Sequence, residues 1–477
     1  MRARYLTTAL PYVNANPHLG HALEFIEADF LARTFRAKGE KVFLTIGTDE
    51  HGAKIAKKAE EEGKDPQAYV DDYALRFKAF ADQFAISYNS FLRTTDPVHV
   101  DAAQEFWKRC EASGDIYKAA YEVKYCVGCE LEKTDSELVH GRCPFHPNME
   151  IEIRSEENYY FRFSRYQDAL LKQYENTPAF VVPEERLREV RTFVESGLKD
   201  FSISRRKEKL SWGVPVPGDE AHVMYVWFDA LVSYISAIGW PRDAQHFSEW
   251  WPVTQLAGKD NLRQQAAMWQ AMLLSAGLPP SRQIFIHGFI TSGGQKMSKS
   301  LGNVIDPLAV VERYGVEATR YVLLRHVSPF EDSDLTLAAI HDYYTAHLTN
   351  GLGNLVARVM KLAEEHLPHP VALTAADALI EDYFFEKAEA FRFNEALDFV
   401  FQKVAAADAF MTEQAPYKGI QSPDAAVRAS AVEAIEHLVR QLARIAAHLV
   451  PAMPDTAAAI TAAIRENRKP RNLFPRL

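Results

Sequence analysis

Two histidines flank a glycine in a short turn near the start of the chain, His18-Leu19-Gly20-His21. If a helix begins here, it offers free backbone N–H groups and the positive end of its dipole, and both suit a phosphate. Gly20 would let a nucleotide approach the backbone, and the imidazoles of His18 and His21 can donate hydrogen bonds to phosphate oxygens. Taken alone, the pattern fits an ordinary surface turn equally well.

A glycine-bounded loop far downstream carries two lysines and reads Gly293-Gly294-Gln295-Lys296-Met297-Ser298-Lys299-Ser300. Lys296 and Lys299 are spaced to reach one polyphosphate. Attack of a carboxylate on an α-phosphate builds charge on the phosphate oxygens, so its catalysis is chiefly positioning and electrostatic stabilisation. The turn and the loop together therefore predict nucleotide chemistry, with His18, His21, Lys296 and Lys299 as catalytic residues.

Three of the four cysteines crowd into one stretch, in which Cys126-x2-Cys129 is followed by Cys143-x2-His146. Three thiolates and one imidazole close a tetrahedral Zn²⁺ shell, which predicts one structural zinc ion per chain. His140 is a competing ligand that ranks below His146 because the x2 spacing repeats. A chance cluster of free thiols is the alternative interpretation. Four cysteines are too few for a disulfide framework, which favours a reducing compartment.

The composition describes a globular chain of 477 residues with 47% hydrophobic residues and a formal net charge of −10. This length predicts two or three domains. A net acidic chain is not the first choice for a nucleic-acid binder. No uninterrupted apolar run of membrane-spanning length and no secretory leader are visible, so we expect a cytoplasmic protein without a membrane partner.

The elements that must position the histidine turn form a β-α-β pattern. Residues 4–10 and 42–46 are apolar runs, and residues 18–38 read as a helix that stops at Gly39. The helical period is carried by Ala22, Phe25, Ile26, Phe30 and Leu31. The pattern predicts a parallel nucleotide-binding sheet of the Rossmann type. A second α/β stretch follows at 255–289, with a strand that ends at Gly258 and another at 283–287.

The rest of the chain divides by pattern into an insertion and a helical bundle. Short strands surround the cysteines, and after about residue 335 only helical patterns remain, which we expect to dock on the catalytic part. The predicted domains are a Rossmann catalytic domain in two halves (1–115 and 166–290), an insertion with a zinc knuckle (116–165), the lysine-loop region (291–338) and an all-α bundle (339–477).

Together these motifs resemble the class I aminoacyl-tRNA synthetases, and among them the methionyl-tRNA synthetase family. His18-Leu19-Gly20-His21 matches the first family signature and Lys296-Met297-Ser298-Lys299-Ser300 the second, in the family's order. Methionyl-type segments surround both: residues 9–12 (ALPY), 47–52 (GTDEHG), 225–230 (YVWFDA) and 258–260 (GKD). The resemblance spans essentially the whole chain. It implies activation of L-methionine by ATP with Mg²⁺, and transfer of the methionyl group to tRNA(Met).

The resemblance also assigns roles to individual residues. It implies that Asp49 holds the methionine ammonium by charge-assisted hydrogen bonding. The methionine pocket would be completed by Leu10, Tyr12, Trp227, Leu231, Tyr234 and Gln265. The residues implied to contact ATP are Gly20, Gly258, Asp260, Ile290 and Lys299, with Gly258 and Asp260 at the ribose and the backbone near Ile290 at the adenine.

The segment after Asp260 departs from the family pattern, because Asn261, Gln265 and Gln270 stand where isoleucine, histidine and proline are commoner. Gln265 occupies the position at which the family's histidine approaches the substrate side chain, and an amide can donate a hydrogen bond to sulfur or to Tyr234. Asn261 would make the pocket more polar. A class I paralogue that activates a different or modified amino acid is therefore the main alternative.

In the predicted bundle, Asn354 and Arg358 lie one turn apart on one helix face. The resemblance implies that both residues, with Tyr417 from the Ala415-Pro416-Tyr417 corner, read the tRNA anticodon. Local basic patches must then bind the RNA, because the total charge is negative; residues 205–207 and the tail after residue 461 are candidates. The chain ends soon after the bundle, and because dimerising family members usually carry a further C-terminal domain, we expect a monomer. An RNA-binding protein with a relic active site is the non-enzymatic alternative.

Overall fold

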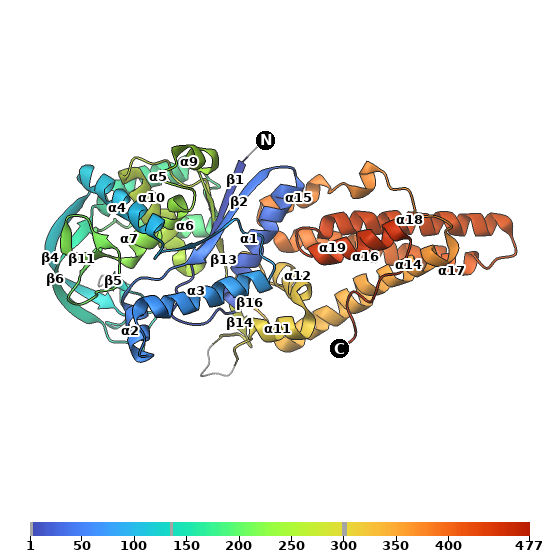
Figure 1. The fold of residues 1–477 in the computed structure, drawn as a ribbon, viewed down its shortest axis with the longest axis horizontal. Coiled ribbons are helices and arrows are strands. Elements are labelled where there is room, and N and C mark those ends of the chain that lie inside the picture. Colours follow the sequence, from blue (N-terminus) through green and yellow to red (C-terminus); the bar gives the residue numbers. More distant parts are fainter. Residues whose placement is uncertain (1–2, 134–136, 298–302) are drawn as a thin grey trace.

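The computed structural model describes residues 3–133, 137–297 and 303–477. The molecule is elongated, with an α/β part that contains the N-terminus and a long helical part at the other end (Figure 1). This arrangement agrees with the predicted order of a Rossmann-type domain followed by a bundle.

The α/β part is built on one six-stranded sheet whose strands are all parallel. Its order is β3-β2-β1-β12-β13-β7. The strands are β1 (Ala3–Thr8), β2 (Lys41–Thr48), β3 (Ser90–Arg93), β7 (Val181–Val182), β12 (Thr254–Gly258) and β13 (Gln283–His287). The central strands are buried on both faces, as expected of a parallel sheet covered by helices. The chain order reverses between β1 and β12, and ligands bind at such a switch point.

Helix α1 (Leu19–Ala37) follows β1 and confirms the predicted β-α-β unit. It ends before Gly39, whose φ of 83° is readily adopted by glycine. The other helical segments of this part are α2 (Ala53–Glu61), α3 (Pro66–Gln83), α4 (Pro97–Ala112), η2 (Phe163–Tyr166), α5 (Gln167–Asn176), α6 (Glu184–Glu195), α7 (Val226–Ala230), α8 (Ser233–Ser236), α9 (Ala244–Trp250), η3 (Lys259–Asn261), η4 (Gln264–Met268) and α10 (Trp269–Ser275).

The insertion forms a four-stranded sheet of order β5-β4-β6-β8, with β4 (Ile116–Cys126), β5 (Leu131–Lys133), β6 (Glu152–Phe161) and β8 (Phe201–Ser202). A three-stranded sheet, β10-β11-β9, lies beyond it and consists of β9 (Ser204–Arg206), β10 (Pro215–Val216) and β11 (Asp219–Met224). The predicted insertion boundary at residue 165 is therefore too early. The chain joins the main sheet at β7 and then returns, because Phe201 packs on Phe161 of β6 with ring centroids 5.7 Å apart.

A small sheet and two helices connect the α/β part to the helical part. They are β14 (Ile290–Ser292), β15 (Gln295–Lys296), β16 (Ser333–Asp334), α11 (Pro307–Tyr314) and α12 (Val316–His326). Beyond β16 the structure is helical, as predicted. The segments are α13 (Leu337–Tyr343), the π-helix η6 (Tyr344–Gly353), α14 (Asn354–His366), η7 (Ala375–Ala378), α15 (Asp382–Glu389), α16 (Phe393–Gln414), α17 (Pro416–Gly419), α18 (Ala425–Leu449) and α19 (Pro454–Glu466). None of the described helices is long and apolar enough to cross a membrane.

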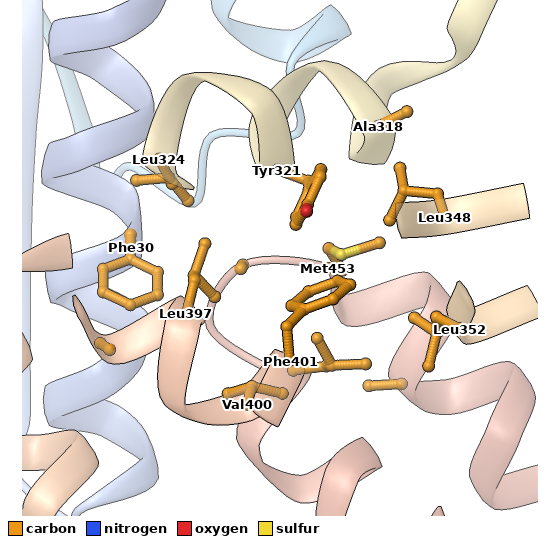
Figure 2. Close-up of a cluster of buried hydrophobic side chains, with 14 of the residues drawn as sticks. Phe30, Ala318, Tyr321, Leu324, Leu348, Leu352, Leu397, Val400, Phe401 and Met453 are labelled. Atoms are coloured by element: carbon orange, nitrogen blue, oxygen red, sulfur yellow. The ribbon is translucent and has the colours of Figure 1, made fainter. Parts of the chain in front are cut away.

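The helical part packs directly on the α/β part through a shared hydrophobic core (Figure 2). Phe30 of α1, Tyr321 of α12 and Phe401 of α16 belong to this one cluster. The fully buried Arg320 of α12 donates to Asp29 of α1 at 2.6 Å and also to the backbone carbonyl of Ala452 at 2.8 Å. Because these contacts join both parts, the expectation that the bundle docks on the catalytic part is confirmed.

Candidate active site and metal centre

The histidine turn lies where β1 ends and α1 begins, beside the end of β12. His18 is the N-cap of α1, and its Nδ1 accepts from the N–H of Gly20 at 3.1 Å. The Nδ1 of His21 in turn accepts from the N–H of His18 at 3.2 Å. The two rings stack with centroids 3.7 Å apart. A Cβ on residue 20 would lie 3.0 Å from the His18 ring, so glycine permits this stack.

These hydrogen bonds fix the tautomers of both histidines. Because each Nδ1 accepts, each neutral ring carries its hydrogen on Nε2. Burial and the neighbouring His18 hold the pKa of His21 well below its usual value. His21 is therefore neutral at physiological pH, and the pair offers two N–H donors at a helix N-terminus, a suitable site for phosphate oxygens.

The lysine loop is described only in part. Lys296 ends β15, and its backbone pairs with Thr291 of β14. Gly293 and Gly294 both have positive φ, and the N–H of Gly294 donates to Asp334 at 2.8 Å, which anchors the turn before Lys296. Residues 298–302, including the predicted catalytic Lys299, lie outside the described residues, so the role of this loop stays a prediction.

The end of β12 brings Gly258 and Asp260 together, as the sequence suggested. A Cβ on residue 258 would lie 2.9 Å from Oδ1 of Asp260, so the glycine leaves room for the carboxylate beside the strand end. The Asn261 amide donates to the same Oδ1 at 3.2 Å. Asn261 thus donates a hydrogen bond to the carboxylate that is predicted to bind the ribose. Ile290, predicted to lie near the adenine, is buried at the start of β14.

A buried ion pair that sequence reasoning missed lies at the same strand ends. Nε2 of His287, at the end of β13, is 3.0 Å from a carboxylate oxygen of Glu24 on α1. The other Glu24 oxygen accepts from the N–H of Ala9 at 2.7 Å, next to Leu10. Burial alone lowers the pKa of His287, but the hydrogen bond to Glu24 and the charges of Glu27 and Glu24 raise it to about 9. His287 is therefore charged at neutral pH and holds Glu24 against the end of β1.

Asp49 lies just beyond the end of β2 and is 7% exposed. Its backbone bridges to Tyr12, with the N–H of Asp49 donating to the Pro11 carbonyl at 2.9 Å. Within the described chain, its Oδ1 has no hydrogen-bond partner. Burial and the charges of Asp229 and Glu130 raise the pKa of this carboxyl well above its usual value. A cationic ligand group would satisfy the oxygen and favour the ionised form, as the predicted ammonium role requires.

The aromatic segment after β11 forms two short helices, α7 and α8, rather than one. Leu231 and Tyr234 are buried, and Trp227 is half-buried. Asp229 on α7 is fully buried between two histidines, with His51 Nδ1 at 2.9 Å and His99 Nε2 at 3.2 Å. These partners outweigh burial and hold the pKa of Asp229 below its usual value. Asp229 was missed by sequence reasoning, although it lies inside a quoted segment, because its histidine partners are far away in the chain.

Gln265 lies in a π-helical turn and is 2% exposed. Its amide donates to the Tyr234 oxygen at 2.6 Å. Tyr234 is one of the two hydrogen-bond acceptors predicted for this amide from the sequence, the other being a substrate sulfur. π-helical turns occur frequently at functional sites.

The predicted metal ligands converge on one point of the insertion. The ligand atoms of Cys126, Cys129, Cys143 and His146 all lie within 4.8 Å of one another. Four of the distances between these atoms lie between 3.2 Å (Cys129 Sγ to His146 Nδ1) and 4.0 Å (Cys143 Sγ to His146 Nδ1). Tetrahedral zinc with Zn–S bonds of about 2.3 Å needs spacings of about 3.8 Å. The donor set therefore fits Zn²⁺.

Two details support His146 rather than His140 as the fourth donor. His140 is not part of the cluster formed by the described residues. A Cβ on residue 128 would lie 2.3 Å from the His146 ring, so the glycine between the first two cysteines makes room for this imidazole.

Glu130 connects the cysteine–histidine cluster to residues predicted to bind methionine. Its carboxylate accepts from the Tyr12 hydroxyl at 3.3 Å and from the N–H of Lys54 at 3.0 Å. The Lys54 ammonium donates to the Gly128 carbonyl at 2.6 Å, and Tyr225 donates to the Glu130 carbonyl. The cysteine-containing segment is thus held by hydrogen bonds to Tyr12, Lys54 and Tyr225.

Two of the predicted anticodon residues, Asn354 and Arg358, lie on α14, which continues without a break from η6, and the third, Tyr417, lies on the short helix α17. Asn354 is exposed at the first position of α14. Arg358 is half-buried and bonds Asp408 of α16 at 2.9 Å. Tyr417, 39% exposed, follows Ala415, whose φ of 41° turns the chain sharply after α16.

One predicted RNA-binding patch is corrected by the structure. Arg205 is buried, because its guanidinium lies over the Tyr225 ring at 4.7 Å from the centroid and donates to Ser202 at 2.7 Å. Only Arg206 and Lys207 of that cluster face solvent. The segment therefore contributes less surface charge than its sequence indicates.

Comparison with known proteins agrees with this site. The family model "tRNA synthetases class I (M)" matches residues 4–152 and 147–360. A methionine–tRNA ligase of Thermosynechococcus vestitus is 41% identical over 468 residues, which cover 94% of this chain and 88% of that protein. One of Thermotoga maritima is 38% identical over 485 residues, covering 98% and 76%.

Solved structures give the same result. Mycobacterium tuberculosis methionyl-tRNA synthetase in complex with methionyl-adenylate matches with a TM-score of 0.91 and 34% identity, over 100% of this chain and 99% of that one. Its apo form matches with a TM-score of 0.83 and 31% identity, over 100% and 97%. The chain therefore belongs to the methionyl-tRNA synthetase family, the class I aminoacyl-tRNA synthetases that act as methionine–tRNA ligases.

Proposed function

We propose that the site at the ends of β1, β2 and β12 activates L-methionine with ATP and that the protein then transfers the methionyl group to tRNA(Met). One observation carries the proposal. The buried Asp49 carboxylate, with an oxygen that lacks a partner in the described chain, lies at the strand ends that also bear the histidine turn of α1. A site for a cationic group and a site for a phosphate thus meet at one switch point.

In the first step, Asp49 binds the methionine ammonium, and the side chain enters the pocket formed with Leu10, Tyr12, Trp227, Leu231, Tyr234 and Gln265. The methionine carboxylate attacks the α-phosphorus of ATP; the P–O bond to the β-phosphate breaks and pyrophosphate leaves. The Nε2–H groups of His18 and His21 donate to phosphate oxygens as charge develops on them. Lys296 and Lys299 supply further positive charge, and Mg²⁺ bound with ATP neutralises the polyphosphate.

The nucleotide binds at the C-terminal ends of the central strands. Asp260 accepts from ribose hydroxyls, Gly20 and Gly258 let the nucleotide approach the backbone, and the backbone near Ile290 meets the adenine. Glu24, held by the charged His287, keeps the end of β1 in place next to Leu10. No protein nucleophile is required, so catalysis consists of positioning and charge placement.

In the second step, the terminal adenosine hydroxyl of the tRNA attacks the adenylate carbonyl, and AMP leaves. Asn354, Arg358 and Tyr417 contact the anticodon, with Tyr417 stacking on an unpaired base. Cys126, Cys129, Cys143 and His146 hold one Zn²⁺ whose four positions are filled by protein, so the metal is structural. A monomeric, cytoplasmic protein remains our prediction.

Pyrophosphate exchange across an amino-acid panel tests the proposal. We expect exchange that depends on methionine, and charging of tRNA(Met). Exchange with another amino acid but not methionine would establish the paralogue alternative. No adenylate formation with any amino acid would support the RNA-binding relic.

A further inference from the structure

Asp229 lies at the centre of a buried contact with two histidines, which we call the Asp229 clamp. The Nδ1 atom of His51 lies 2.9 Å from one carboxylate oxygen, and the Nε2 atom of His99 lies 3.2 Å from the other. All three side chains are buried, with exposed fractions of at most 5%. They come from the loop after β2, from α4 and from α7, so the clamp joins three elements that are distant in the chain.

The two contacts require both histidines to donate. Burial raises the pKa of Asp229, but the two histidine partners outweigh burial and hold this pKa below its usual value, so the carboxylate is ionised. An ionised carboxylate only accepts hydrogen bonds, so His51 carries a hydrogen on Nδ1 and His99 carries one on Nε2. Hydrogen bonds to an ionised acceptor are stronger than those between neutral groups, so the clamp holds its three elements firmly.

His51 connects the clamp to the proposed ammonium site. It follows Asp49 by two residues, and its backbone N–H donates to the Asp49 carboxylate. The charge of Asp229 also acts on Asp49, so the two carboxylates lie near one another. The intervening Glu50 accepts from Arg93 of β3 at 2.8 and 2.9 Å. The loop is thus fastened to the sheet on one side and to the clamp on the other.

Asp229 itself connects the clamp to the apolar wall proposed for the methionine side chain. It lies on α7, a helix of five residues that also carries Trp227. So short a helix is not stable by itself, and its position depends on its tertiary contacts. His99 anchors it to α4, and the neighbouring Phe228 adds to this anchor, with its ring centroid 5.3 Å from that of Trp107.

We propose that Asp229 is a positioning residue that fixes the spacing between the ammonium site at Asp49 and the apolar wall at Trp227. The inference rests on the proposed function and deepens it. A ligand that contacts both subsites benefits from this spacing, because the loop and α7 do not have to be ordered when it binds. A ligand that contacts the wall alone gains nothing. The clamp therefore favours amino acids whose side chain reaches the wall while the ammonium group reaches Asp49.

Pyrophosphate exchange in a set of matched variants tests the proposal. Asp229→Asn removes one acceptor, because an amide offers a single oxygen. His99→Leu removes one donor and leaves the charge of Asp229 in place, whereas His99→Gln keeps a donor near the position of Nε2. Asp115→Asn is the matched control: Asp115 lies beyond the other end of α4, is 1% exposed and accepts from three side chains, one of them Ser275 at 2.8 Å.

Two inhibitors separate the two subsites. Methylthiopropylamine has the methionine side chain and an ammonium group, and methionol differs from it only by a hydroxyl in place of the ammonium. Each is measured as a competitor of methionine in the exchange reaction, which gives its Ki in every variant.

We expect KM for methionine and Ki for methylthiopropylamine to rise at least about fivefold in Asp229→Asn and His99→Leu, the lower end of typical coupling between two sites. Both constants should stay within about twofold in His99→Gln and Asp115→Asn. Because neither methionol nor ATP bridges the two subsites, Ki for methionol and KM for ATP should stay within about twofold in every variant.

Several results would overturn the proposal. An equal rise in Ki for methionol and for the amine would show a merely structural role. A defect in Asp229→Asn but not in His99→Leu would assign the effect to the charge of Asp229 rather than to positioning. An unchanged KM for methionine in both variants, no rescue by His99→Gln, or an equal rise in the Asp115 variant would also contradict the proposal. Absence of methionine-dependent exchange in the unaltered protein would instead contradict the proposed function.

Discussion

Replacing Asp49, the carboxylate proposed to bind the methionine ammonium, should make the free protein more stable but weaken methionine binding. In the unliganded protein, Asp49 is 7% exposed and its Oδ1 lacks a partner in the described chain. The neighbouring charges of Asp229 and Glu130 repel it. Leaving a buried polar group unsatisfied costs about 1–3 kcal/mol. Asp49→Asn keeps an oxygen for the backbone N–H of His51 and removes the charge that burial and these neighbours disfavour, so we expect a gain of up to about this amount in the free energy of unfolding.

The same change should weaken methionine binding severely. Removing one partner of a buried ion pair costs about 3–5 kcal/mol. At about 1.4 kcal/mol per power of ten, KM for methionine should rise by roughly two to nearly four powers of ten. Because the pKa of the free carboxyl is raised, protonation of Asp49 competes with binding of the ammonium, so in the unaltered protein KM should also rise as the pH is lowered.

Thermal melting with and without methionine, together with pyrophosphate exchange, measures both effects. Methionine should raise the melting temperature of the unaltered protein but not of Asp49→Asn. Glu27→Gln is the matched control: Glu27 is also a buried acid, with an unpartnered oxygen in the described chain and a pKa raised by burial to about 8. It should stabilise the protein near pH 8 with KM unchanged within twofold. A less stable Asp49→Asn variant with an ordinary KM would refute the reasoning.

Three further predictions concern other parts of the molecule. Gly128→Ala places a Cβ 2.3 Å from the His146 ring, so zinc content measured by atomic absorption should fall below one ion per chain; full occupancy would contradict this assignment. The pKa of His287 rises on folding to about 9, so its stabilising contribution is complete below pH 6.5 and is lost as the pH approaches 9. Chemical denaturation over this pH range should show that the free energy of unfolding falls by an amount on the order of 1–3 kcal/mol in the unaltered protein, and that this fall is absent in His287→Gln. The same pH dependence in both proteins would contradict the prediction. Tyr417→Ala should raise KM for tRNA at least fivefold by loss of base stacking without changing pyrophosphate exchange; unchanged aminoacylation would exclude the contact.

The parts of the fold that follow from local pattern could be predicted from the sequence. The helical spacing from Ala22 to Leu31, with Gly39 after it, is enough to place α1 between β1 and β2. The cysteine spacing likewise predicted the donor cluster, including the choice of His146. In both cases the determining residues are close in the chain, so their types and intervals carry the information.

Other features depend on contacts that no local pattern records. Strand β8 has two residues, too short for an alternation signal, and depends on its partner β6. Glu24 and His287 are 263 positions apart, yet their pairing raises the pKa of the imidazole. Asp229 is similarly defined by two distant histidines. The sequence can mark such residues as polar groups near strand ends, but only tertiary folding selects their partners.

The acidic charge of the chain acquires a specific meaning in this site. Asp49, Glu130 and Asp229 are buried close enough to act on one another. Asp229 has two histidines and Glu130 has Tyr12 and Lys54, whereas in the described chain Oδ1 of Asp49 has none. Of these three carboxylates, the one with an unpartnered oxygen in the described chain is thus the one proposed to meet an ammonium group. The unpartnered carboxylate lowers the stability of the protein without ligand. Because linkage is reciprocal, a cationic ligand that pairs with this carboxylate restores that stability, and the site therefore favours cationic ligands.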